Sequence, residues 1–181
     1  MAEAFSNKLA RAVGVVSTSS AGTVGVTTNL ITGVSTTGLN VGDLVDNLYY
    51  IAGTKVLNFG TAASQVVCDR DSTNTASASS QNVKFLAPNS VYQSPNNVKS
   101  ILIGGTFANN TTSQVNLWVA MYDNSVTTQV GIAQKIPVPS GSSFVIADTG
   151  KTLLEASDEI RVFSDTANAI DVSLSILTGV N

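Results

Sequence analysis

Two segments in the second half of the chain place an apolar residue at every second position. They are 114–122 and 169–177, and their apolar positions are Val115, Leu117, Val119, Met121, Ile170, Val172, Leu174 and Ile176. A period of two indicates a β-strand with one buried face. Weaker strands are predicted over 98–107, 144–147 and 158–163, with turn-rich spacers between them. Strands that recur without intervening helices predict antiparallel sheets packed face to face as a sandwich.

The chain is therefore predicted to be all-β, with two modules. Residues 98–181 form a C-terminal antiparallel β-sandwich of jelly-roll or immunoglobulin-like type. Residues 17–86 are rich in Ser, Thr, Gly and Val, which predicts a small β module of short strands punctuated by turns. Pro88 and Pro95 bracket a predicted linker over 87–97, where turn-forming residues dominate.

Residues 1–16 are predicted to form a short N-terminal helix or a flexible arm. Phe5, Leu9 and Ala12 lie near the helical spacing of i, i+4 and i+7 within the segment 2–12. A helix of about eleven residues is marginal in isolation. We therefore expect Phe5 and Leu9 to dock on a partner.

The composition excludes several functions. The chain of 181 residues has no histidine and only 12% charged residues, so the Ser-His-Asp and Cys-His forms of nucleophilic catalysis are excluded. A net charge of −3 argues against a nucleic-acid partner, because the phosphate backbone needs a basic surface. No stretch approaches the roughly 20 apolar residues that span a bilayer, and no signal peptide is recognisable. We expect neither membrane association nor export by the standard route.

Two acidic clusters could carry chemistry, and each has a structural alternative. Glu155, Asp158 and Glu159 could act as the paired carboxylates of a glycosidase, or they could cap and solvate the start of a strand. The stretch 69–74 (DRDSTN) could hold calcium or be a solvated strand end.

Cys68 is the single cysteine and is expected to be a buried small hydrophobe. We predict no catalytic residue, no metal site and no cofactor.

Three aromatic residues fall on the nominally outward faces of predicted strands. They are Trp118, Tyr122 and Phe163. Together they could form an exposed apolar patch for a partner subunit. The alternative is a strand buried on both faces, and the sequence leaves both open.

The segment 42–85 resembles a β module that recurs in structural proteins of tailed bacteriophages. It contains a Gly-Asp pair, then a strand, and then a turn and strand of the form I-x-G-T-x-V; the matching positions are Gly42, Asp43, Ile51, Gly53, Thr54 and Val56. The Pro that usually precedes the Ala-Gly-Thr turn is absent. The match covers about a quarter of the chain.

The second half resembles another module of the same phage proteins. Its markers are an x-N-N-T sequence at 108–111, the sequence IPVPSGSS at 136–143, and L-x-x-x-D-x-I-R-V at 154–162. Small β-sandwiches of this kind occur in head decoration, neck and tail components. The order of the two modules looks most like that in cyanophage proteins.

The resemblance implies a non-enzymatic structural protein located in the virion. Such a protein acts through contacts with other virion proteins and is expected to form a homo-oligomer on the head, neck or tail. The candidate interface residues are Phe5, Leu9, Trp118, Tyr122 and Phe163. The alternative is a receptor- or glycan-binding fibre or adhesin module that uses exposed aromatic side chains. A third reading, a surface-polymer hydrolase, would depend on Glu155, Asp158 and Glu159.

Overall fold

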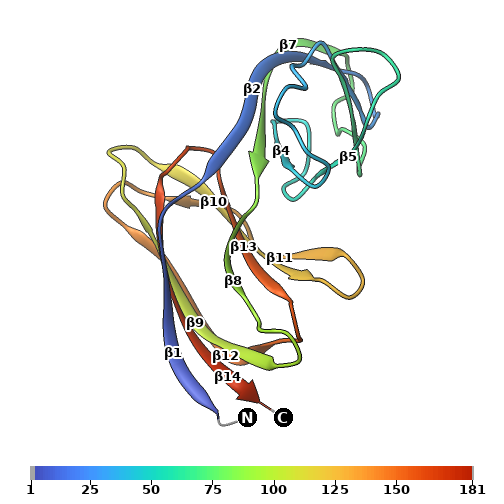
Figure 1. Cartoon of the computed structure of the whole chain (residues 1–181). Coiled ribbons are helices and arrows are strands. Elements are labelled where there is room, and N and C mark those ends of the chain that lie inside the picture. Colours follow the sequence, from blue (N-terminus) through green and yellow to red (C-terminus); the bar gives the residue numbers. More distant parts are fainter. Residues whose placement is uncertain (1–2, 181) are drawn as a thin grey trace. The chain divides into compact units, whose positions relative to one another are not determined.

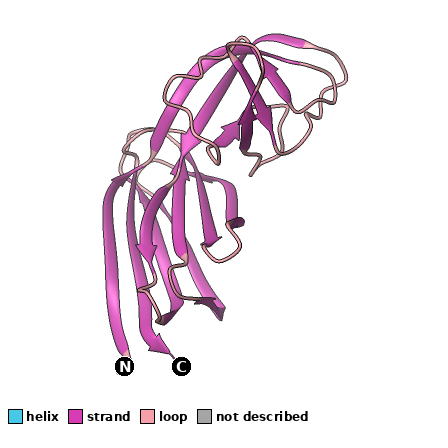
Figure 2. Ribbon diagram, turned by 45° about the vertical axis from the view of Figure 1, so that its right-hand side comes forward, coloured by secondary structure: helices cyan, strands magenta, loops and turns pink. Residues whose placement is uncertain are grey.

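The computed structural model describes residues 3–180, and the side chains of all of them except 147–150. The described residues form strands, turns and loops, without helices (Figures 1 and 2). The predicted all-β class is therefore confirmed. No described segment is a helix of the length and apolarity that crossing a membrane requires. The chain divides into two compact units, Met1–Gly14 with Asn89–Asn181 (unit 1) and Val15–Pro88 (unit 2).

Unit 1 is a sandwich of two four-stranded antiparallel sheets. One sheet has the order β1-β14-β9-β12 and the other β11-β10-β13-β8. The strands are β1 (Ala4–Val13), β8 (Asn89–Gln93), β9 (Lys99–Asn109), β10 (Val115–Asp123), β11 (Thr128–Val138), β12 (Ser143–Leu154), β13 (Glu159–Ser164) and β14 (Ile170–Val180). Numbered one to eight along the chain, they run 1-8-3-6 and 5-4-7-2, which is the strand order of a jelly roll.

The core of unit 1 lies between these two sheets. The apolar positions of the alternating segment in β14 are all buried, as are those of β10 from Val115 to Val119. They pack with Phe107, Leu154 and Ile160. The period-two pattern thus identified both strands and their inward faces correctly, because one face of each strand is removed from water.

The prediction of an N-terminal helix or arm is wrong, because these residues form β1. This strand pairs with β14, and Phe5 lies opposite Leu177 while Leu9 lies opposite Ser173. A separation of four residues places two side chains on one face of a helix and also on one face of a strand. The spacing was therefore ambiguous, and a sheet edge that supplies hydrogen-bond partners outweighed a marginal helix propensity. Ala2, at which the predicted helix begins, lies outside the described residues.

The predicted linker over 87–97 is also wrong, because it contains strand β8 of the sandwich. Tyr92 lies opposite Ile160 of β13 and is buried in the core. Its hydroxyl is 2.8 Å from the Ser100 Oγ, which is 2.8 Å from the Ser94 Oγ. A five-residue strand is too short for its pattern to stand out among turn-forming neighbours.

Unit 2 is a single antiparallel sheet with the order β4-β7-β2-β3-β6-β5, and it closes on itself. Its strands are β2 (Val15–Val24), β3 (Leu30–Thr32), β4 (Leu44–Asp46), β5 (Val56–Phe59), β6 (Gln65–Cys68) and β7 (Ala78–Ala87). The two end strands meet: Gly42 N donates to Val56 O and Val45 N donates to Thr54 O. The result is a small barrel around Ile31, Val66 and Phe85. The predicted module 17–86 lies within unit 2.

The residues of the Gly-Asp and I-x-G-T-x-V patterns shape turns of this barrel. Gly42 has a φ of 94°, a conformation that favours glycine. The buried Asp43 follows it, and its Oδ2 accepts hydrogen bonds from Ser17 Oγ (2.9 Å) and Asn40 N (3.1 Å). Thr54 Oγ1 donates to Ile51 O at 2.8 Å. These side chains replace water around backbone groups that a tight turn leaves without partners.

Unit 2 is inserted between the first and second strands of the sandwich. Its first and last strands, β2 and β7, pair with each other, and Val15 lies opposite Ala87. The chain therefore enters and leaves the barrel at neighbouring positions.

The two leucines at the end of β12 provide a test of the sandwich. Leu154 is 0% exposed and Leu153 is 44% exposed. We expect Leu154→Ala to lower the free energy of unfolding by about 2–5 kcal/mol, because it removes core volume. The matched Leu153→Ala should cost about 1 kcal/mol or less. Urea denaturation measures both changes, and equal losses would contradict the assignment of faces in β12.

Cys68 provides a test of the barrel interior. Burial raises the pKa of its thiol from 9.0 to about 12, and burial also raises the pKa of the neighbouring Tyr50 hydroxyl. Both groups ionise more readily in the unfolded chain, so their contribution to stability is complete below about pH 9 and is lost as the pH rises towards 12.

We expect the free energy of unfolding to fall between pH 9 and 12, and to fall less steeply in a Cys68→Ala variant. Denaturation series at each pH measure the slope. We also expect the thiol of the folded protein to resist alkylation at pH 8. Identical slopes in the two proteins, or rapid alkylation of the native state, would contradict the buried, neutral thiol.

Candidate interaction surface

One side of the sheet β1-β14-β9-β12 faces the core, and the opposite side carries an apolar row that crosses all four strands. Phe5 lies opposite Leu177, Leu177 opposite Ile101, and Ile101 opposite Leu153. Phe5 is 64% exposed and Leu153 is 44% exposed. With strands about 4.8 Å apart, the row is about 14 Å long. Apolar residues at all four positions on a solvent-facing side are unusual, because alternation normally places polar residues there.

A second row crosses the same sheet and has apolar residues at both ends. Leu9 lies opposite Ser173, Ser173 opposite Thr106, and Thr106 opposite Val145. Leu9 is 76% exposed. Between the rows lie the small neutral residues Asn7, Ser175 and Gly104, which oppose one another in register. We call the six apolar side chains of these rows the apolar face; they are Phe5, Leu9, Ile101, Val145, Leu153 and Leu177.

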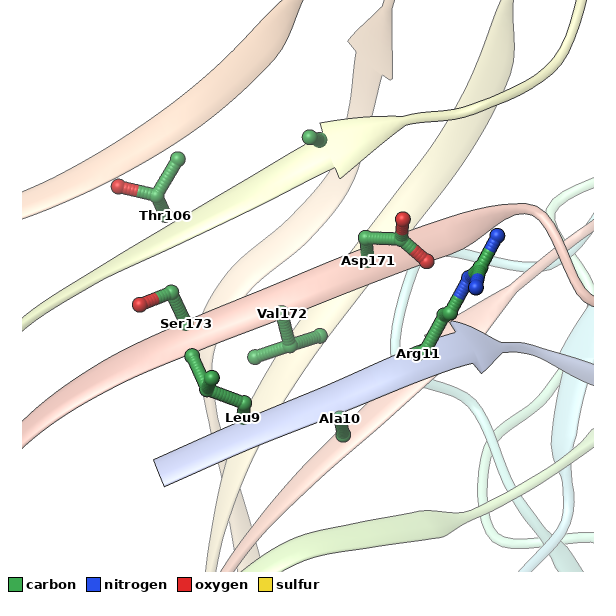
Figure 3. Close-up of a pocket in the computed structure, with 8 residues that line it drawn as sticks. Leu9, Ala10, Arg11, Thr106, Asp171, Val172 and Ser173 are labelled. Atoms are coloured by element: carbon green, nitrogen blue, oxygen red, sulfur yellow. The ribbon is translucent and has the colours of Figure 1, made fainter. Parts of the chain in front are cut away.

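A shallow groove of about 370 Å³ runs beside the second row (Figure 3). It is lined by Leu9, Thr106 and Ser173, with Arg11 and Asp171 at one end. Asp171 holds the end of β1, because its Oδ1 accepts hydrogen bonds from Ala12 N at 2.8 Å and Asn110 Nδ2 at 3.2 Å. Arg11 and Asp171 carry opposite charges, so this end of the groove has no net charge.

Two of the five predicted interface residues, Phe5 and Leu9, lie on the apolar face. Both are exposed and belong to a strand, and their contact with a partner stays a prediction. Trp118 and Phe163, opposite each other on β10 and β13, are 2% and 0% exposed. The prediction that they form an exposed patch is wrong, and the alternative of strands buried on both faces describes them. Leu117 and Val162, their neighbours along the chain, point to the core from one face of the strands. Trp118 and Phe163 point from the other face, and that face is also removed from solvent.

Tyr122 is half-buried, and its ring is covered by a cation. The Arg161 guanidinium carbon lies 3.5 Å from the ring centroid. Arg161 Nε also donates to Glu159 Oε2 at 2.8 Å, which fixes the guanidinium over the ring. This arrangement occupies one face of the aromatic ring that a ligand would use for stacking.

The three acidic residues considered for hydrolysis each bind a different structural partner. Asp158 is buried, and its two carboxylate oxygens accept hydrogen bonds from Asn124 N (3.1 Å) and Glu155 N (3.0 Å). Glu155 forms an exposed ion pair with Lys99, and Glu159 binds Arg161. These contacts match the alternative in which the cluster caps the start of β13.

The stretch considered for calcium is likewise engaged in the fold. Asp69 Oδ1 accepts a hydrogen bond from Lys55 N at 2.8 Å. Asn74 Nδ2 donates to Val24 O and Ala76 O. Within residues 3–180, no group of three or more His, Cys, Asp or Glu side chains is arranged to hold a metal ion.

Sequence reasoning missed four members of the apolar face, Ile101, Val145, Leu153 and Leu177. One signal was available. Leu177 lies on the same face of β14 as Ser173 and Ser175. An apolar residue therefore follows two polar ones on the solvent-facing side of this strand. The face could not be assembled without the register, because its members come from four strands that are remote in sequence.

Asp158 and Glu155 provide a matched test of the structural role of the acidic cluster. We expect Asp158→Ala to lower the free energy of unfolding by about 1–3 kcal/mol, because two backbone N–H groups lose their acceptor. Glu155→Ala removes only an exposed ion pair and should cost less than about 1 kcal/mol. Thermal or urea unfolding measures both. A larger loss from Glu155→Ala would contradict these roles.

Comparison with known proteins returned no relative. No family model matches the chain, and neither a curated protein nor a solved structure is significantly similar to it.

Proposed function

We propose that the protein is a non-enzymatic structural component of a tailed-phage virion. It acts through protein–protein contacts as a head decoration, neck or tail accessory protein. Its partners are other virion proteins and further copies of itself. The observation that carries the proposal is the apolar face, whose exposed Phe5, Leu9 and Leu153 form a surface that suits burial against protein.

One further observation supports a non-enzymatic role. The acidic cluster that a hydrolase would need is committed to backbone and ion-pair contacts, with Asp158 buried. A polymer chain could not reach a carboxylate that is removed from solvent.

The receptor- or glycan-binding alternative depends on exposed aromatic rings. Trp118 is buried, and the ring of Tyr122 lies under Arg161. The groove beside the apolar face is lined by Leu9, Thr106 and Ser173 and offers no aromatic platform. The exposed ring of Phe5 lies in a row with the aliphatic Leu177 and Leu153, a surface that suits contact with protein.

Incorporation into particles tests the proposal. We expect purified virions of the encoding phage to contain the protein, and Leu153→Asp to reduce its copies per particle by at least about tenfold, because a charge would be buried in the contact. The control is Val126→Asp, at an exposed position in the turn between β10 and β11. Quantitative mass spectrometry of particles measures both variants.

Absence of the wild-type protein from virions, or turnover of a polymer by the purified protein, would overturn the proposal. Equal incorporation of the two variants would show that the apolar face is not the contact. Circular dichroism of each variant establishes that it is folded before particles are analysed.

A further inference from the structure

The sandwich has four edge strands, and three of them carry features that hinder the addition of another strand. β8 is only five residues long. β11 contains Pro137, and its pairing with β10 shifts register at two places. β12 shifts register between Ala147 and Thr152. Short length, proline and bulges are the usual means by which proteins protect sheet edges.

β1 offers the longest regular edge: it carries one charged residue there, Lys8, and its register shifts only between Ala10 and Val13. Its pairing with β14 runs without a shift from Ala4 to Ala10. One edge of this straight segment faces β14 and the other is not paired within the sheet, because β1 is the terminal strand of its order. Phe5 and Leu9 project from it on the apolar face. An extended segment of seven residues with exposed apolar side chains is a template for strand addition.

We propose that β1 pairs with β1 of a second copy of the protein, antiparallel, about a two-fold axis at Asn7. This inference rests on the proposed function as an assembling protein, and it specifies the partner and the register. The two four-stranded sheets then join into one sheet of eight strands. The apolar faces of both copies lie on the same side and become continuous.

The register at Asn7 follows from the residues that it places opposite one another. Phe5 faces Leu9 of the second copy, so the two most exposed apolar side chains of β1 cover each other. Beyond the regular segment, Glu3 at one end and Arg11 at the other bring opposite charges near each other across the axis. A two-fold axis duplicates both contacts, as expected for a self-complementary interface.

Neighbouring two-fold registers lose these contacts. An axis at Lys8 would place Lys8 opposite itself and Phe5 opposite Arg11, and like charges directly opposite are unfavourable. An axis at Ser6 would place Glu3 opposite Leu9 and Phe5 opposite Asn7. The axis at Asn7 instead sets Lys8 against the neutral Ser6.

Disulfide trapping in the full chain tests the register. In an antiparallel pair, residues directly opposite have Cα atoms about 4.5–5.5 Å apart, within the range that a disulfide spans. We expect Asn7→Cys to form a covalent dimer under mild oxidation. The matched control Leu9→Cys should form no covalent dimer, because the two copies of residue 9 are four positions apart along the strand. Cys68 is buried and does not interfere.

Sedimentation of the wild-type protein gives an independent measurement. We expect a concentration-dependent dimer. Phe5→Asp should raise the dissociation constant of this dimer by at least about tenfold. A wild-type chain that stays monomeric, or trapping of Leu9→Cys as efficient as that of Asn7→Cys, would overturn the inference. A monomer that still occupies virions would overturn only the pairing of β1. A dimer that is absent from virions would support the pairing and overturn the proposed function.

Discussion

The pairing of β1 with β14 is the interaction on which the sandwich depends. It joins the first strand of the chain to the last, and the contact between Ala12 and Asp171 bridges 159 positions. Without it, the sheet β1-β14-β9-β12 would lose its terminal strand, and one side of β14 would be left without backbone partners. The contact has a high sequence separation, and loop-closure entropy makes such pairings slow to form. The jelly roll is therefore completed only when both ends of the chain have met.

The sequence was informative where one strand face is buried over a long segment. β10 and β14 were predicted with their inward sets because four apolar residues recur at every second position in each. β1 was misread because the spacing of Phe5 and Leu9 fits a helix and a strand equally well, and only the neighbouring β14 decides between them. β8 was missed because a five-residue strand next to two prolines resembles a loop.

The candidate interaction surface was predictable only in part, for a related reason. Phe5 and Leu9 were predicted as contact residues from the apolar side of a helix, and both are exposed although the helix is wrong. Trp118 and Phe163 were assigned outward by the same alternation that placed Leu117 and Val162 inward, but alternation does not report whether the second face of a strand is covered. Burial of both faces depends on tertiary packing, which no local period encodes.

The insertion of the barrel into the sandwich has a consequence for the history of the molecule. Gly14 N donates to Asn89 Oδ1 at 2.7 Å, so the two ends of unit 1 that flank the insertion touch each other. A short turn could bridge this gap in an ancestral jelly roll, and a complete domain could be gained, lost or exchanged there without altering a single core residue of the host. The junction at Gly14 and Asn89 is thus a position at which the barrel can be inserted or removed while the core of the sandwich is preserved.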